Sequence, residues 1–358
     1  MTESDKIVAE TAARIFADLA DPQTINSAGD ERWKAPLWRA LSDAGLTLAW
    51  VPENLGGAGA SLSDGFAVLG SAGRFAVAVP LAETMIAGWL LAQGAIAAPS
   101  GPMTIAPVRP RDRITLNPDG TLNGRASGIP FASECEHIAV AADSDKGAVI
   151  ALVKTADCRV ADGKSLASEA SNAVTFDGVK PVRNAAAPAG FDASTLILFG
   201  AAVRGVEIAG ALETILSLSV AYANERVAFE RKIGKFQAVQ QNLARLAGET
   251  AAALAASGSA ADTIAQASAQ ASTYDDIVFL EAASAKIRAG EAATEGAAIA
   301  HQVFGAIGFT KEHVLHRFTL RMLAWRDDFG NESHWAAALG NMIARRGHNQ
   351  FWPMLASR

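Results

Sequence analysis

Apolar residues recur at helical spacing through the first hundred positions of the chain. The spacing of three to four residues holds from Ile7 to Leu19 and from Trp38 to Leu46. Two further helical runs extend from Ser63 to about Gly73 and from Ala82 to Leu91, and prolines and glycines separate the runs. The pattern predicts an N-terminal helical domain over residues 1–100.

From about Gly101 to Pro188 the pattern changes to short alternating or β-branched runs. Turn-forming residues separate these runs, and Asn117-Pro118-Asp119-Gly120 is a strong turn signal between two of them. The predicted strands are Met103–Val108, Ile114–Leu116, His137–Ala141, Ala148–Val153 and Ala173–Phe176. This segment predicts a small middle domain with an antiparallel sheet over residues 101–190.

The helical period returns after Phe191 and persists to the end of the chain. Predicted helices cover residues 194–224, 237–270, 274–304, 311–326 and 333–346. The segment Ala251–Ser272 is rich in Ala and Ser, but its Ala content and apolar flanks favour a surface helix over a linker. We therefore predict a C-terminal four-helix bundle domain over residues 191–358, and an α+β multi-domain fold that is mainly α.

Composition and charge narrow the class of protein. The chain has 358 residues, half of them apolar, and a formal net charge of −6, with Lys and Arg interspersed among acids. These features argue against a nucleic-acid partner. The apolar stretch from Met85 to Pro99 is shorter than the roughly 20 residues of a membrane span. The N-terminus has early acids and no apolar signal region, so we expect a cytoplasmic protein with no membrane partner.

Metal-ligand patterns are weak in this sequence. Cys135 and Cys158 form neither a disulfide framework nor a metal spacing. His313 and His316 stand three residues apart on a predicted helix, but no carboxylate or cysteine completes a ligand set. We predict no metal site.

Four motifs, in this order, resemble those of the acyl-CoA dehydrogenase family, whose domains also run helical, β, helical. They are LSDAGLTLAWVPENLGGAGASLSD at 41–64, NERVAFERKIGKFQAVQQNLA at 224–244, HQVFGAIGFTKEH at 301–313 and RMLAWRDDFGNESHW at 321–335. The last motif occupies the place of the family's C-terminal active-site loop. The resemblance covers essentially the whole chain.

The resemblance implies FAD as cofactor and a set of residues that bind it. A pyrophosphate needs donors without bulk, which Arg and Gln side chains and glycine-flanked backbone provide. The implied cofactor-binding residues are Arg226, Phe229, Gln237, Gln302, Phe304, Gly305 and Gly308. In the family these elements reach the FAD of a neighbouring subunit, so an oligomer is also implied. Taken singly, each residue has a plain structural alternative, such as an ion pair between Arg226 and Glu230.

The catalytic base of the family is missing from its expected places. Most members supply a Glu just before a Gly in the C-terminal loop, and Phe329 stands there before Gly330. A minority supply it from the helix ahead of the Arg-x-x-Phe motif, where Gly200 or Ala201 stands. The weak substitutes nearby are Asp328 and Glu332. The helix position that anchors acyl-CoA in the family reads Phe-Gly-Ala-Ala at 199–202, and the β domain lacks the family's flavin-contacting motifs.

This asymmetric loss resembles the small, base-lacking subunit of heteromeric acyl-CoA dehydrogenases, which act in steroid side-chain degradation. The resemblance implies a catalytic large subunit as partner in an α2β2 heterotetramer. It also implies an acyl-CoA substrate, a role in lipid metabolism and an electron-transfer flavoprotein as acceptor. Two alternatives remain open. One is a self-sufficient homo-oligomeric dehydrogenase that uses Asp328, Glu332 or another acid as base, and the other is a flavin-free scaffold or binding protein.

Overall fold

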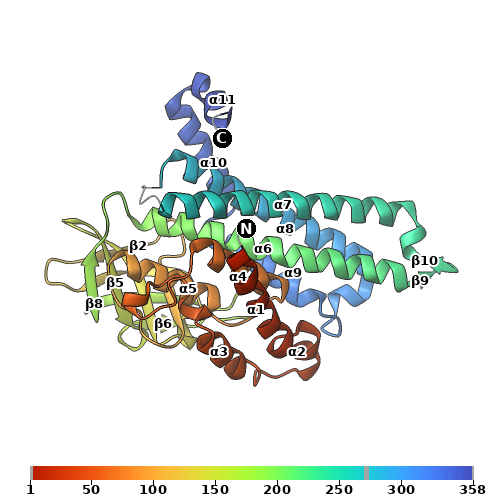
Figure 1. The fold of residues 1–358 in the computed structure, drawn as a ribbon, viewed down its shortest axis with the longest axis horizontal. Coiled ribbons are helices and arrows are strands. Elements are labelled where there is room, and N and C mark those ends of the chain that lie inside the picture. The colour runs from red at the N-terminus through yellow and green to blue at the C-terminus, as the bar shows by residue number, and fades with distance from the viewer. Residues whose placement is uncertain (1–2, 270–273, 357–358) are drawn as a thin grey trace.

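The computed structural model describes residues 3–269 and 274–356. Its first part is a group of helices joined by short 3-10 turns, shown in red and orange in Figure 1. The helices are α1 (Glu3–Leu19), α2 (Pro22–Ala28), α3 (Lys34–Asp43), α4 (Leu62–Arg74) and α5 (Leu81–Gln93), and the turns are η1 (Leu46–Leu48) and η2 (Glu53–Leu55).

Helices α4 and α5 are stabilised in different ways. Helix α4 begins with a capping box, in which Ser61 Oγ accepts from the Asp64 amide and the Asp64 carboxylate accepts from the Ser61 amide. In helix α5, every residue from Leu81 to Leu91 is buried, including the carboxylate of Glu83. Because no face of α5 meets water, this acid must find its partners inside the protein.

The middle part is one mixed β-sheet. Its strands are β1 (Met103–Ala106), β2 (Arg113–Leu116), β3 (Leu122–Pro130), β4 (His137–Ser144), β5 (Gly147–Lys154), β6 (Arg159–Ala161), β7 (Ser171–Val179) and β8 (Arg183–Ala186), with turns η3 (Ala132–Glu134) and η4 (Thr155–Asp157). The order is β6-β7-β3-β2-β4-β5-β8, and β1 pairs with β4. Most pairs are antiparallel, as expected, but β4 pairs in parallel with both β1 and β2.

The C-terminal part is built on long helices that lie side by side (Figure 1). They are α6 (Ala193–Glu225), α7 (Gln237–Ala269), α8 (Asp276–Phe304) and α9 (Leu315–Asp327), followed by α10 (Glu332–Arg346) and α11 (His348–Ala356). A small hairpin of β9 (Val227–Ala228) and β10 (Arg231–Lys232) and the turn η5 (Ile233–Lys235) join α6 to α7. The turn η6 (Gly305–Phe309) follows α8.

Helix α6 is the centre of the molecule. By length and composition it could cross a membrane, but 89% of its most apolar window is buried inside the protein, as in a core helix. It contacts α4, α7, α8 and α9. Phe199 on α6 stacks on Trp89 of α5, with ring centroids 3.8 Å apart. The segment that replaces the family's acyl-CoA anchor is therefore part of the core.

Two expected helices differ at their starts. The helix expected from residue 311 begins at Leu315, because η6 and the residues after it form turns. The last long helix begins at Glu332 rather than after Ser333, because the Asn331 side chain caps it by accepting from the His334 amide. The Ala- and Ser-rich segment is helical through Ala269, and the rest of that expectation lies outside the described residues.

Candidate functional site

The predicted flavin-binding residues gather at one end of the C-terminal helices. Helix α6 ends at Glu225 with Arg226 as its C-cap, and α7 begins at Gln237. Helix α8 brings Gln302 and Phe304 to its last turn. Figure 1 shows the β9–β10 hairpin projecting from this end, opposite the sheet. We call this set of residues (Arg226, Phe229, Gln237, Gln302, Gly305) the bundle-end surface.

The polar side chains of the bundle-end surface are exposed and have no hydrogen-bond partner among the described residues. The side chains of Arg226, Gln237 and Gln302 make no hydrogen bond or ion pair with any residue that the structure describes. In particular, Arg226 does not pair with Glu230, which was the plain alternative for this arginine. A guanidinium and two amides are thus free to bind an anionic or polar ligand from outside the chain.

The hairpin holds Phe229 in an unfavourable position. Phe229 and Glu230 have φ angles of +51° and +64°, which glycine or asparagine adopts far more readily in a two-residue hairpin turn. The Phe229 side chain is 90% exposed, and its ring lies edge-on to Phe236, at 6.2 Å between ring centroids. The strained turn costs stability, and the exposed Phe229 ring does not recover that cost by packing within this chain. Backbone strain of this kind is typical of binding sites.

Phe304, Gly305 and Gly308 have separate roles. Phe304 is buried and stacks on Tyr222 of α6 at 4.4 Å, so it packs beneath the surface. Gly308 is also buried, and a methyl group there would crowd Phe304. Gly305 has φ +63° and ψ −141°, a conformation that favours glycine, and nothing lies within 4 Å of where its Cβ would stand. Only Gly305 therefore offers open backbone to a ligand.

His301, beside Gln302, is held in place by its neighbours. Its Nε2 lies 3.1 Å from Thr319 Oγ1, and its ring stacks on Phe309 at 4.5 Å. Burial lowers its pKa, against a hydrogen bond with the backbone of Gly308 that raises it. The imidazole is therefore neutral at pH 7 and adds no charge to the bundle-end surface.

A second set of residues lies where α5, α6 and the loop after α9 meet. Arg204 on α6 is buried and contacts three carboxylates: Glu83 at 2.5 Å, Glu207 at 2.6 Å and Asp328 at 3.0 Å. Its guanidinium also lies 5.7 Å from the ring of Trp325. We call these four charged residues the Arg204 cluster.

The Arg204 cluster carries more acid than base. Burial alone would lower the pKa of Arg204, but the charges of Glu83, Glu207 and Asp328 raise it well above its ordinary value. Burial raises the pKa of Glu207 to about 7, against the opposing effect of Arg204. Burial also raises the pKa of Glu83 and of Asp328. The cluster therefore holds an arginine that stays charged and acids that retain protons easily.

The two positions at which the resemblance places a catalytic base, 329 and 200, pack against each other. The ring of Phe329 is fully buried, and a methyl group on Gly200 would overlap it. Phe329 has φ +55°, and its carbonyl accepts a hydrogen bond of 2.9 Å from Trp335 Nε1. An apolar ring thus occupies the space between the active-site loop and α6, and no carboxylate stands at either position.

The two weak base candidates are both engaged. Asp328 Oδ2 lies 3.0–3.1 Å from two nitrogens of Arg204, so its lone pairs face the guanidinium. Glu332 packs against α8 at Gly290, where a methyl group would overlap its carboxylate, and it lies 3.8 Å from Arg326 Nε. Neither carboxylate is free to take a proton from a substrate in this arrangement.

From the sequence, Asp328 was a weak base candidate, but its contact with Arg204 was not foreseen. Glu83 and Lys286 were overlooked, although a charged residue within an otherwise apolar helix is a usable signal. Lys286 Nζ donates to the carbonyls of Trp325 at 2.9 Å and Arg326 at 2.5 Å, so it satisfies the C-terminal end of α9. Burial lowers the pKa of Lys286 to about 7.

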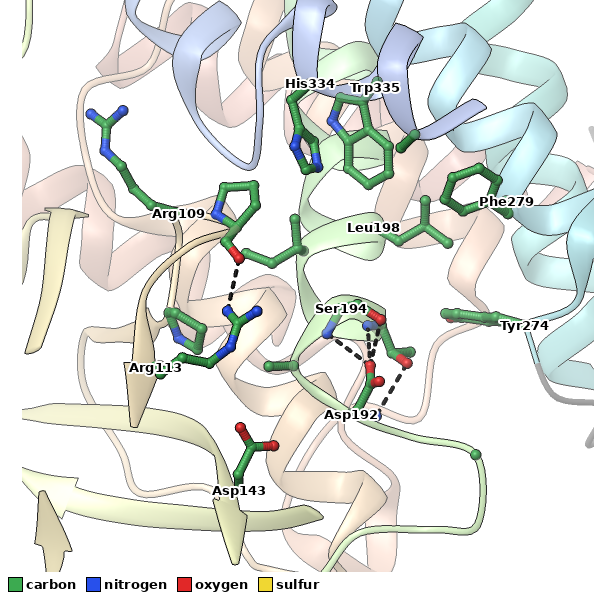
Figure 2. Close-up of a pocket in the computed structure, with 17 residues that line it drawn as sticks. Arg109, Arg113, Asp143, Asp192, Ser194, Leu198, Tyr274, Phe279, His334 and Trp335 are labelled. Atoms are coloured by element: carbon green, nitrogen blue, oxygen red, sulfur yellow. Dashed lines mark hydrogen bonds between the residues drawn. The ribbon is translucent and has the colours of Figure 1, made fainter. Parts of the chain in front are cut away.

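Outside the filled centre lies a cavity of about 430 Å³ between the sheet and the C-terminal helices. Figure 2 shows Arg113 and Asp143 on the sheet side, His334 and Trp335 above, and Tyr274 and Phe279 on the far side. Asp192, at the foot of α6, is occupied as its N-cap and accepts from the amides of Ser194 and Thr195.

The bundle-end surface fits the demands of a flavin dinucleotide, and the residues in the middle of the chain are of a different kind. An unpaired arginine, two free amides and an open glycine match a pyrophosphate and its flanking groups. The centre instead holds an apolar ring and a neutralised acid.

Comparison with known proteins agrees with the fold. Residues 2–97 match the acyl-CoA dehydrogenase N-terminal domain, and residues 192–332 match the acyl-CoA dehydrogenase C-terminal domain. The acyl-CoA dehydrogenase IpdE2 of Mycobacterium tuberculosis is 30% identical over 322 residues, which cover 89% of this chain and 91% of that protein.

Solved structures extend the likeness over nearly the full length. The ChsE4–ChsE5 complex from Mycobacterium tuberculosis contains a chain that superposes with a TM-score of 0.84 at 24% identity, covering 96% of this chain and 98% of that one. A variant of the Tcur3481–Tcur3483 steroid acyl-CoA dehydrogenase gives a TM-score of 0.82 at 24% identity, with the same coverage. With helices, sheet and helices in the same order, and with a relative at 30% identity over most of its length, this chain belongs to the acyl-CoA dehydrogenase family.

Proposed function

We propose that this chain is a non-catalytic subunit that completes the FAD site of a catalytic acyl-CoA dehydrogenase subunit. The observation that carries the proposal is the packing of Phe329 against Gly200, which fills both of the places where the family holds its base. In the Arg204 cluster beside it, the Asp328 carboxylate forms an ion pair with the Arg204 guanidinium. The reaction of the complex would be α,β-dehydrogenation of an acyl-CoA thioester.

The bundle-end surface supports the cofactor part of the proposal. FAD, when bound, would accept the hydride that leaves the β carbon of the thioester. Arg226 would hold pyrophosphate oxygens, Gln237 and Gln302 would donate their amide hydrogens, and Gly305 would let the backbone approach. The exposed ring of Phe229 would cover apolar surface of the cofactor or the partner.

The partner part of the proposal is supported by the structural neighbours. Two of them are two-protein assemblies by name, ChsE4–ChsE5 and Tcur3481–Tcur3483, and the second is a steroid acyl-CoA dehydrogenase. By analogy we propose an α2β2 heterotetramer with a catalytic large subunit and a steroid-derived or similarly bulky acyl-CoA as substrate. An electron-transfer flavoprotein as acceptor and a cytoplasmic location complete the proposal.

Flavin retention by the complex tests this role. In Arg226→Ala one charge-assisted contact is lost, worth roughly 1.5–3 kcal/mol, so the dissociation constant for FAD should rise about 10- to 150-fold. FAD released from the complex is measured by its fluorescence on dilution. Arg159→Ala is the matched control, because Arg159 is exposed in the sheet domain and pairs only with Asp177 at 3.7 Å. Equal flavin retention in the two variants would contradict the proposed role of Arg226.

A further inference from the structure

A cavity of about 240 Å³ lies among α1, α4, α6 and α7, and the proposed function does not use it. The described residues that line it belong to these four helices, and none of them is part of the sheet, the bundle-end surface or the Arg204 cluster. Helices α4 and α6 are in close contact beside it, because a methyl group on Gly210 would overlap the carbonyl of Gly70. On α7, by contrast, nothing lies within 4 Å of where the Cβ of Gly258 would stand. Space is therefore open beside α7.

The walls of the cavity are mainly apolar. Helix α7 contributes residues that recur every three or four positions and so share one face, namely Leu254, Ser257, Gly258 and Ala261. Phe66 on α4 also lines the cavity, and its ring centroid lies 5.3 Å from that of Trp50 and 5.8 Å from that of Phe199. These aromatic contacts fix the Phe66 ring, so this wall is in place before a ligand binds.

Ser257 adds a polar group to this apolar lining. Its side chain is buried, and Ser257 Oγ lies 3.1 Å from where a Cβ on Gly205 of α6 would stand. Among the described residues the Ser257 hydroxyl has no hydrogen-bond partner. A buried hydroxyl without a partner destabilises the folded chain, and a ligand that carries an O–H group could form the missing hydrogen bond.

The charged residues of the lining disfavour an anionic ligand. Arg74 on α4 and Glu213 on α6 form an ion pair at 2.6 Å, and both side chains are partly exposed. Asp262 on α7 is exposed and has no ion-pair partner within the described part of the chain. The lining thus holds one arginine and two acids, and the acid without a partner would repel a carboxylate.

We propose that this cavity binds a small neutral alcohol whose apolar body has about the size of one aromatic ring. The apolar body would lie against Phe66 and Leu254, and the hydroxyl would bind Ser257. A cavity of roughly 150 Å³ holds benzene in another protein, so 240 Å³ has room for a ring with one substituent. Binding at this site would be an activity of this chain alone, without FAD or a partner subunit.

Three probes with the same ring test the ligand class: 4-fluorobenzyl alcohol, 4-fluorotoluene and 4-fluorobenzoate. Each is titrated into the purified full-length chain, and binding is followed by fluorine NMR. We expect the alcohol to bind at least about tenfold more tightly than the benzoate, because a carboxylate loses more hydration on burial and meets the acids of the lining. Equal or tighter binding of the benzoate, or no binding of the alcohol at about millimolar concentration, would overturn the proposal.

Ser257→Ala tests the polar contact. It should weaken binding of the alcohol by about 2- to 13-fold, which is the effect of one hydrogen bond, and leave binding of 4-fluorotoluene unchanged. Ser259→Ala is the matched control, because Ser259 is exposed on the same helix. An equal effect of the two substitutions on the alcohol would contradict the assignment of Ser257.

A second set of variants tests the location. Gly258→Leu and Ala67→Leu each place a larger side chain at the cavity and should weaken binding of all probes that bind the unchanged chain. Gly248→Leu is the control, because Gly248 is also exposed on α7 with nothing within 4 Å of its Cβ position but does not line the cavity. Leucine is a better helix former than glycine, so both glycine variants should fold, which circular dichroism checks. Unchanged binding in both Gly258→Leu and Ala67→Leu would overturn the proposal. Each outcome is independent of flavin content, so it leaves the proposed subunit role to its own test.

Discussion

Replacing Arg204 by methionine should destabilise the protein severely. The substitution keeps much of the side-chain volume but removes the guanidinium that contacts Glu83, Glu207 and Asp328. Breaking a buried ion pair by removing one partner typically costs about 3–5 kcal/mol, because the remaining charge is buried without compensation. We expect Arg204→Met to lower the free energy of unfolding at pH 7 by about this amount.

Arg74→Met is the matched control. Arg74 contacts Glu213 at 2.6 Å, a distance similar to those in the Arg204 cluster, but both side chains are partly exposed. Exposed pairs contribute about 0–1 kcal/mol. Urea unfolding followed by tryptophan fluorescence compares the two variants with the unchanged chain.

The pH dependence separates a charge effect from a packing effect. Without the guanidinium, the folded-state pKa values of the three carboxyl groups lie above their unfolded values. Arg204 lowers the pKa of all three groups, so its removal raises their folded-state pKa values further. Up to the pKa of about 7 that Glu207 has in the unchanged chain, the Glu207 contribution falls with the same slope in both proteins, and above it this contribution keeps falling only in the variant. The deficit of Arg204→Met should therefore grow as the pH rises from about 7 to about 9. A loss no larger than that of Arg74→Met, or a deficit that does not change with pH, would refute the reasoning.

Two further substitutions test individual residues. Burial raises the pKa of Glu207 to about 7, so its cost to the folded state grows as pH rises towards that value, by at most about 1.4 kcal/mol per pH unit. Glu207→Gln should remove this part of the pH dependence of the unfolding free energy, and identical slopes in the two proteins would contradict the assignment. Phe229→Asn should stabilise the isolated chain by about 1 kcal/mol, because asparagine tolerates the positive φ at the hairpin. The same variant should retain less flavin in the complex, and a stabilised variant with full flavin content would argue against a binding role for the ring.

The order of the domains could be predicted because periodicity alone distinguishes the helices from the strands. The strand expected at Ile114–Leu116 is seen as Arg113–Leu116, and the one at Ala148–Val153 as Gly147–Lys154. The period of the sequence does not predict which strands pair with each other, because strand pairing depends on contacts between residues far apart in the chain. The parallel alignment of β4 with β1 and β2 was for that reason not foreseen.

The absence of a carboxylate at positions 329 and 200 could also be read from the sequence, because Phe329 and Gly200 stand where the resemblance places carboxylates. That these two residues touch could not be read, since nothing in the sequence places residue 329 against residue 200. The same holds for Glu83, which meets Arg204 across 121 positions of the chain. The burial of the Phe304 side chain against Tyr222 could not be read either, and its contact with the cofactor stays a prediction.

The central claim is that this chain completes a flavin site but does not form one alone. The visible absorption spectrum in the flavin band tests it most directly, recorded for the chain purified alone and for the chain co-purified with a candidate catalytic dehydrogenase subunit. The account predicts a colourless chain and a yellow, stable complex. A yellow homo-oligomer of this chain alone would contradict it and would direct attention to Asp328 and Glu332 as bases.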